Sequence, residues 1–133
     1  IEVEKCIRIL DRFLNEYAKR DKVAIFKSKG KLIKTEYDNI IYLESRNTTV
    51  IVHLVKNEVI KIYGKLDDVE AELSDRRFLR THKSYIINMN HIKSVDDNFV
   101  TDTDEEVIIR TRGSSGIKNE YYEYIKSTME DRE

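Results

Sequence analysis

The stretch Phe78–Val95, FLRTHKSYIINMNHIKSV, is unusual for a folded core. Polar or basic side chains stand at alternate positions, Arg80, His82 and Ser84, where a buried β-strand would carry apolar residues. The segment 76–93 contains five lysines and arginines, two histidines and no carboxylate. Because the formal net charge of the chain is only −1, an anionic partner would have to meet a local basic surface of this kind.

The composition describes one folded domain. The 133 residues are 40% hydrophobic and 37% charged, which suffices for a single core and is too apolar for a disordered chain. One cysteine, Cys6, permits neither an internal disulfide nor a cysteine zinc cluster, which suits a reducing compartment. No apolar run approaches the roughly 20 residues of a membrane helix, and no signal peptide is visible. We therefore expect a cytoplasmic domain with no membrane contact, and the start at Ile1 suggests a piece of a longer protein.

The first twenty residues carry the pattern of an amphipathic helix. Apolar residues recur at alternating steps of four and three positions: Val3, Ile7, Leu10, Leu14 and Tyr17. The stripe covers about two heptads, which leaves two interpretations open. The helix either packs on its own domain, or links to a preceding domain and pairs with a second copy. We assign residues 1–21 to an N-terminal linker helix and residues 22–133 to the domain.

From Lys22 onward the period is that of β-strands. Short β-prone runs separated by turn residues occupy the segments 23–28, 31–36, 39–45, 49–64, 91–95 and 107–112. Consecutive hairpins imply antiparallel pairing rather than parallel strands joined by helices. A short amphipathic helix is expected over residues 65–73, and a C-terminal helix from Ile117. The predicted domain is mostly β.

No catalytic or metal-binding pattern is present. The three histidines, His53, His82 and His91, lie in none of the spacings typical of zinc enzymes, and no nucleophile elbow, dinucleotide fingerprint or phosphate loop occurs. The acid-rich run 96–106 lacks the order of an EF-hand and suits a solvated hairpin protected by charge. We predict that the domain is not an enzyme and needs no cofactor or metal.

Acidic and basic residues are segregated along the chain. Residues 94–109 carry six acids and no lysine or arginine, whereas residues 107–119 carry three bases and no acid. Together with the segment 76–93 and the turn around Arg46, three separate loops present hydrogen-bond donors without carboxylates close by in sequence. Such groups suit the phosphates and the major-groove base edges of DNA.

Two motifs resemble a known family. FLRTHKSYIINMNHI, residues 78–92, closely resembles the F-x-R-x-H-[K/N]-S-x-[I/L/V]-[I/V]-N-x3-I core of the LytTR DNA-binding domain family. NIIYLESRNTTVIVHL, residues 39–54, resembles the upstream element of that family, and YGKLDDVEAEL, residues 63–73, fits the short helix between them. The likeness spans roughly residues 22–126.

The resemblance implies a bacterial transcription regulator, most often the output half of a two-component response regulator. It implies a fold of elongated, packed antiparallel β-sheets with one short mid-chain helix, plus the linker helix and the C-terminal helix. It also implies loops that enter successive major grooves on one face of double-stranded DNA and bend it. The expected partner is promoter DNA with direct repeats, bound by a possible homodimer.

The resemblance further implies which residues contact DNA, in three loops. The predicted residues are Asn47, Thr48, Thr49, Arg80, Lys83, Ser84, Arg112 and Lys118. Lys83 occupies the base-reading position of the second loop. The third loop departs from the family pattern, because Gly113–Gly116 stands where members usually have a Ser-Arg pair. Both Arg112 and Lys118 are therefore candidates for its basic contact.

Several alternatives remain open at the level of sequence. His82 either pins its loop through ring hydrogen bonds or touches DNA, and Arg80 either pairs with Glu44 or reaches a phosphate. The GSSG segment matches the GxxG that clamps RNA in KH domains, although there it lies between helices. An RNA-binding or protein-interaction module using the same basic loops is thus the alternative function.

Overall fold

The computed structural model describes residues 22–131, so the predicted linker helix over residues 1–21 lies outside the described residues. The prediction of a mostly β domain is confirmed. The strands are β1 (Val23–Ser28), β2 (Lys31–Glu36), β3 (Ile40–Arg46), β4 (Thr49–Leu54), β5 (Val59–Tyr63), β6 (Phe78–His82), β7 (Tyr85–Asn88), β8 (Ile92–Val95), β9 (Phe99–Thr101) and β10 (Glu106–Val107). The helices are α2 (Leu66–Glu72), α3 (Ser114–Asp131) and the 3-10 turns η1 (Tyr37–Asn39), η2 (Val55–Asn57) and η3 (Met89–His91).

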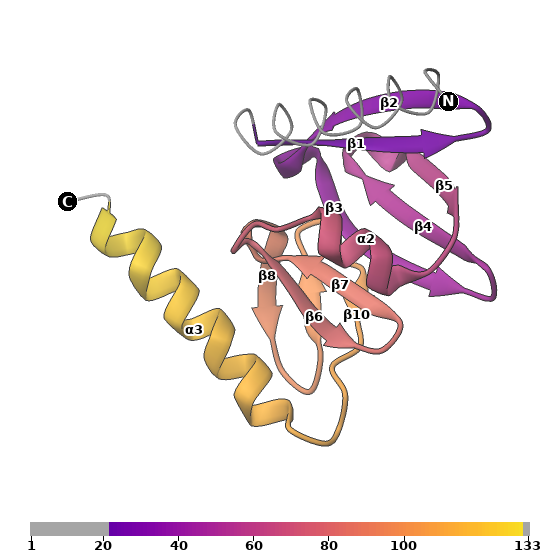
Figure 1. The fold of residues 1–133 in the computed structure, drawn as a ribbon. Coiled ribbons are helices and arrows are strands. Elements are labelled where there is room, and N and C mark those ends of the chain that lie inside the picture. The colour runs from indigo at the N-terminus through magenta and orange to yellow at the C-terminus, as the bar shows by residue number, and fades with distance from the viewer. Residues whose placement is uncertain (1–21, 132–133) are drawn as a thin grey trace.

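The strands form three antiparallel sheets (Figure 1). A central five-stranded sheet has the order β5-β4-β3-β7-β6, a three-stranded sheet has the order β10-β9-β8, and β1 pairs with β2 alone. The reversals expected at Lys29-Gly30 and near residues 56–58 are both observed. No helix within residues 22–131 is long and apolar enough to cross a membrane.

The central sheet is buried on both faces at β3 and β7, whereas β5 at its edge exposes one face. Leu43 and Ile86 pack into a cluster with the β1–β2 hairpin and α2, whereas Tyr42 and Ile87 pack into a second cluster with the three-stranded sheet and the start of α3. Successive strand residues point to opposite faces, which explains why neighbours such as Ile86 and Ile87 are both fully buried. A register shift in β3 after Ile40 adjusts the strand between these two layers.

The short mid-chain helix forms as its pattern predicts. Leu66, Val69 and Leu73 recur at helical spacing and are all buried against the sheet. The C-terminal helix starts earlier than expected, at Ser114 rather than Ile117. The residues Ser114–Gly116 therefore form its first turn and are not an inserted loop.

The prediction of a strand over residues 107–112 is wrong beyond Val107, because β10 contains only Glu106 and Val107. Past Val107 the backbone finds partners outside any ladder. Ile109 N–H donates to the side chain of Asn98 at 3.0 Å, and Ile108 C=O accepts from the hydroxyl of Thr81 at 2.9 Å.

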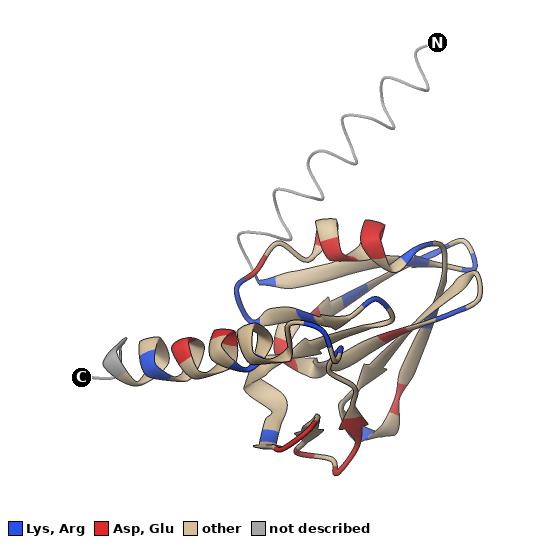
Figure 2. Ribbon diagram, turned by 90° about the horizontal axis from the view of Figure 1, so that it is seen from below, with Lys and Arg blue, Asp and Glu red and all other residues tan. Residues whose placement is uncertain are grey.

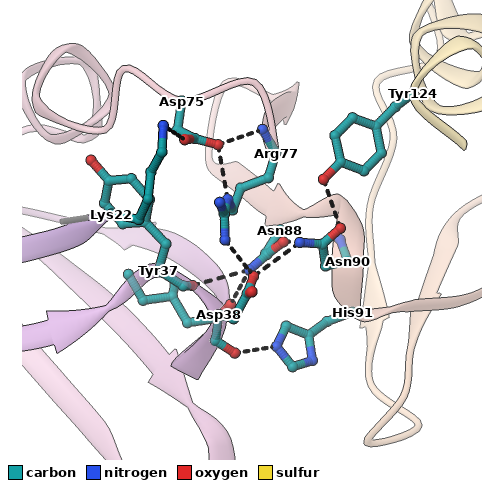
Figure 3. Close-up of polar contacts among 10 residues, drawn as sticks. Lys22, Tyr37, Asp38, Asp75, Arg77, Asn88, Asn90, His91 and Tyr124 are labelled. Atoms are coloured by element: carbon teal, nitrogen blue, oxygen red, sulfur yellow. Dashed lines mark hydrogen bonds and ion pairs between the residues drawn. The ribbon is translucent and has the colours of Figure 1, made fainter. Parts of the chain in front are cut away.

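A buried asparagine joins the layers at one junction (Figure 3). Asn88, with no exposed surface, donates from Nδ2 to the carbonyls of Tyr37 at 3.1 Å and Ile40 at 2.9 Å. Its Oδ1 accepts from Asn90 N–H at 2.9 Å. Both side-chain groups are thus satisfied, and η1 is fixed to the end of β7.

Ion pairs and ring contacts surround this asparagine. Arg77 bridges Asp38 at 2.7 Å and Asp75 at 2.8 Å, and His91 contacts the carbonyl of Asp38 at 2.5 Å and the carboxylate of Asp102 at 2.7 Å. Burial alone would raise the pKa of Asp75, but hydrogen bonds from Arg77 outweigh burial and hold that pKa below its ordinary value. The junction therefore favours the charged forms of Asp38 and Asp75, which Arg77 ties together between η1 and the start of β6.

Replacing Asn88 by alanine should destabilise the domain. The substitution leaves two buried carbonyls short of a donor, so we expect the free energy of unfolding in urea to fall by about 2 to 3 kcal/mol. Asn119→Ala, on the exposed surface of α3, is the matched control and should change that free energy by less than about 0.5 kcal/mol. Equal effects of the two substitutions would show that Asn88 does not hold the junction.

Candidate nucleic-acid interface

Two of the predicted contact loops lie side by side. The β3–β4 turn and the β6–β7 turn project from adjacent strands, and Ser45 N–H donates to Ser84 C=O across them at 2.9 Å. Asn47 has a positive φ of 54°, a conformation that asparagine tolerates better than most residues and that closes the tight turn. A groove of about 480 Å³ is bounded by the two turns and the β5–α2 junction, and Asn47 and Lys83 are among the residues that line it.

The third loop is anchored beside the second. Arg110 N–H donates to Thr81 C=O at 2.8 Å, two residues before the β6–β7 turn, which begins at Lys83. In Figure 1 the β3–β4 turn, the β6–β7 turn and the segment preceding α3 follow one another along the lower right edge of the molecule. The structure therefore brings all three predicted loops to a common edge.

The predicted side chains differ in how freely they face solvent. Asn47, Thr48, Lys83 and Arg112 are exposed, whereas those half-buried are Thr49, Arg80, Ser84 and Lys118. Lys83 and Arg112 form no ion pair within the described part of the chain. These two cations are thus available to an external anion.

Arg80 is occupied within the domain. Its guanidinium pairs with Asp67 at 2.9 Å and Glu70 at 3.0 Å, both on α2. It also donates to the carbonyls of His82 at 2.9 Å and Lys83 at 2.5 Å. Of the two alternatives for Arg80, the pairing with Glu44 is not among these contacts, which make Arg80 a brace between α2 and the β6–β7 turn.

His82 pins its own turn. Its Nδ1 accepts a hydrogen bond from Ser84 N–H at 3.1 Å, and its ring lies 5.8 Å from that of Tyr85. An Nδ1 that accepts carries no proton, so the ring is held with its Nε2 free to donate. The structure thus bears out the loop-pinning interpretation of this histidine.

A buried acid lies beneath the first turn and is compensated. Glu44 contacts His53 Nε2 at 2.7 Å and receives a hydrogen bond from Arg46 Nε at 3.3 Å. His53 also stacks on Tyr42, with ring centroids 4.1 Å apart. Because Glu44 is buried and paired, it presents no bare carboxylate to the edge.

Acidic residues gather elsewhere. Figure 2 shows acidic residues grouped at the lower edge of the view, with others on α2 and α3. The turns of the three-stranded sheet hold acids that pair locally, such as Asp104 with Lys93 at 2.7 Å and Asp102 with His91. The acid-rich segment 96–106 is therefore gathered in turns other than the three predicted contact loops.

The geometry offers no metal centre. Within residues 22–131, no group of three or more histidine, cysteine, aspartate or glutamate side chains could hold a metal ion. A further wall of the groove is the β5–α2 junction, formed by Tyr63, Gly64 and Lys65. These residues begin the YGKLDDVEAEL stretch that resembles the short helix of the family, but that resemblance did not mark them as contact residues, and the pairing of β5 with β4 places them at the edge.

Comparison with known proteins agrees with this arrangement. The family model of the LytTr DNA-binding domain matches residues 30–129. A solved structure described as a LytTr DNA-binding domain from Bacillus cereus superimposes with a TM-score of 0.61 at 24% identity, covering 74% of this chain and 95% of that one. This likeness concerns the fold.

Two curated relatives are more similar in sequence. The transcriptional regulatory protein NatR of Bacillus subtilis is 32% identical over 71 residues, which are 52% of this chain and 29% of that protein. The accessory gene regulator protein A of Staphylococcus epidermidis is 39% identical over 66 residues, 48% of this chain and 26% of that protein. The matched region thus spans less than a third of these relatives.

If Arg80 braces the β6–β7 turn against α2, replacing it should lower the stability of the domain. Arg80→Gln removes the ion pairs to α2 and the bonds to two turn carbonyls, so the free energy of unfolding in urea should fall by about 1 to 2 kcal/mol. Arg112→Gln is the control, because Arg112 is exposed and unpaired within the described residues, and it should change that value by less than about 0.5 kcal/mol. A wild-type unfolding curve for Arg80→Gln would contradict the bracing role.

Proposed function

Because the chain belongs to the LytTr DNA-binding domain family, we propose that it recognises specific sequences of double-stranded DNA and thereby regulates transcription. The observation that carries this proposal is the common edge formed by three loops, two of which present unpaired cations. Exposed cations held on a rigid scaffold neutralise phosphates and favour association with a polyanion.

The loops, rather than a helix, enter the DNA in this proposal. The apolar face of α2 is buried against the sheet, and its acids Asp67 and Glu70 are paired with Arg80. A β-turn on a two-stranded ribbon fits the width of a major groove. Loops along one edge suit successive grooves on one face of a duplex, and a duplex that bends toward the protein would meet them all.

Each loop has a distinct role in the proposal. Lys83 reads a base edge from the second turn, because its ammonium is exposed and its turn is fixed by Arg80 and His82. The first turn contributes Asn47, Thr48 and Thr49 to bases and phosphates. Residues assigned to phosphate contact are Ser84, Arg112 and Lys118. Arg80 is assigned to positioning.

The proposed context is the cytoplasmic output module of a response regulator. The relatives include a transcriptional regulatory protein, an accessory gene regulator and the sensory transduction protein LytT of Oceanobacillus iheyensis. Because the matched region is a fraction of each, the remainder of such proteins would supply the signal input. Residues 1–21 would then form the linker to it.

The RNA-binding alternative loses its main support. Ser114–Gly116, the centre of the GSSG match, lies in the first turn of α3 and not in a loop between two helices. A protein partner for the same edge is the other alternative, and it predicts no preference among duplexes in the binding tests below.

Lys83→Ala should reduce discrimination between DNA sequences. A duplex selected by the wild-type chain from a random pool should bind the variant about 1 to 3 kcal/mol more weakly, and a scrambled duplex should lose much less. Fluorescence anisotropy over a range of salt concentrations measures both losses, and Lys126→Ala on the exposed face of α3 is the control. Equal losses on the two duplexes would reassign Lys83 to phosphate contact.

Two half-sites should bind better than one. We expect direct repeats spaced by about one helical turn to bind two copies of the chain on the same face of the duplex, as a homodimer on DNA. Footprinting and sedimentation on duplexes with one repeat, two repeats, and two repeats offset by half a turn measure this. Equal affinity and a single protected site on all three would contradict the arrangement.

A further inference from the structure

Tyr63 is an aromatic side chain with little to cover it. It ends β5, and 84% of its surface is exposed, more than for any other large hydrophobic residue in the described part of the chain. A tyrosine ring buries a large apolar area on contact, and its hydroxyl can donate or accept, which is why tyrosine is favoured at interfaces. The location of this ring therefore bears on what the edge binds.

The backbone fixes Tyr63 to the first contact turn. Tyr63 pairs with Thr49 in the β4–β5 ladder, and the next residue, Gly64, donates its N–H to Thr48 C=O at 2.8 Å. Gly64 has a φ of +145°, which favours glycine and lets the chain leave β5 for α2 immediately after the tyrosine. Tyr63 is thus held in register with the turn.

Tyr63 lies beside the groove that the two turns and the β5–α2 junction bound. Tyr63 lines that groove together with Asn47, Thr48 and Lys83. Lys65, exposed and unpaired within the described residues, lies on the same wall, and the nearby carboxylate of Asp67 is engaged by Arg80. Tyr63 is therefore near hydrogen-bond donors and the two cations Lys65 and Lys83, unpaired within the described part of the chain, an environment complementary to a polyanion.

The register argues for the DNA backbone rather than a base edge. Tyr63 lies opposite Thr49, behind the tip of the turn at Asn47 and Thr48. If the tip enters a major groove, a side chain set back from it meets the sugars and phosphates that border the groove. Tyrosine can pack its ring on a deoxyribose and donate its hydroxyl to a phosphate.

We propose that Tyr63 is a further DNA-contacting residue, which packs on the sugar–phosphate backbone bordering the groove that the β3–β4 turn enters. This inference rests on the proposed function and extends the interface to the β5–α2 junction. Because the contact carries no base information, Tyr63 contributes affinity to every duplex rather than selectivity.

The test compares Tyr63→Ala and Tyr63→Phe with the wild-type chain on a selected duplex and on a scrambled duplex, by anisotropy. Tyr63→Ala should weaken both by a similar factor of about fivefold to tenfold, and Tyr63→Phe by about twofold, because it keeps the ring and loses the hydroxyl. Tyr122→Ala, an exposed tyrosine on α3 at 52%, is the control and should bind like wild type. Thermal unfolding of all variants should be unchanged.

Three outcomes would overturn the inference. Wild-type affinity of Tyr63→Ala, with Lys83→Ala still impaired, removes Tyr63 from the interface and leaves the proposed function intact. A loss confined to the selected duplex would make Tyr63 a base contact and refute the backbone assignment. Absence of binding to any duplex by the wild-type chain would refute the proposed function and this inference together.

Discussion

The buried amide of Asn88 is the constraint on which the arrangement of the edge depends. By bonding two carbonyls around η1 and the N–H of Asn90, it fixes the start of β3 against the end of β7. β3 and β7 then pair from Tyr42 opposite Ile87 toward the bond between Ser45 and Ser84. A slip of one residue would invert every side chain on both faces, so the two contact turns can meet only in this register.

The strands β3 and β7 are buried on both faces, and the turns that join them to β4 and β6 are exposed. Around these turns, the local charge depends on which charged side chains are paired and not on how many acids and bases the chain contains. Glu44 and Asp67 lie close to the edge, and each is paired with a base of the domain, although Asp67 shares Arg80 with Glu70. Lys83, by contrast, has no partner within the described residues. A nearly neutral domain thereby presents a local cationic edge, as the acid-free stretch in its sequence indicates.

Local patterns predicted the hairpins and α2, because alternation, turn residues and the spacing of Leu66, Val69 and Leu73 act over a few positions. Long-range contacts decided the rest. The run after Val107 is β-prone but bonds to Asn98 and Thr81, distant side chains that no local pattern shows. Likewise, the partners of Arg80 come from α2, and the groove wall at Tyr63 arises from pairing with β4. The family motif located the contact loops but not their supports.

The separation of the tips from the core has an evolutionary consequence. Asn47, Thr48 and Lys83 belong to neither apolar cluster, and the bonds that fix the two turns run through backbone groups and the side chains of Arg80 and His82. Substitutions at Thr48 and Lys83 therefore leave both clusters and these bonds in place, whereas the positive φ of Asn47 limits which residues can replace it. Gene duplicates could diverge in the operators they choose by exchanging a handful of surface codons while inheriting an unaltered interior.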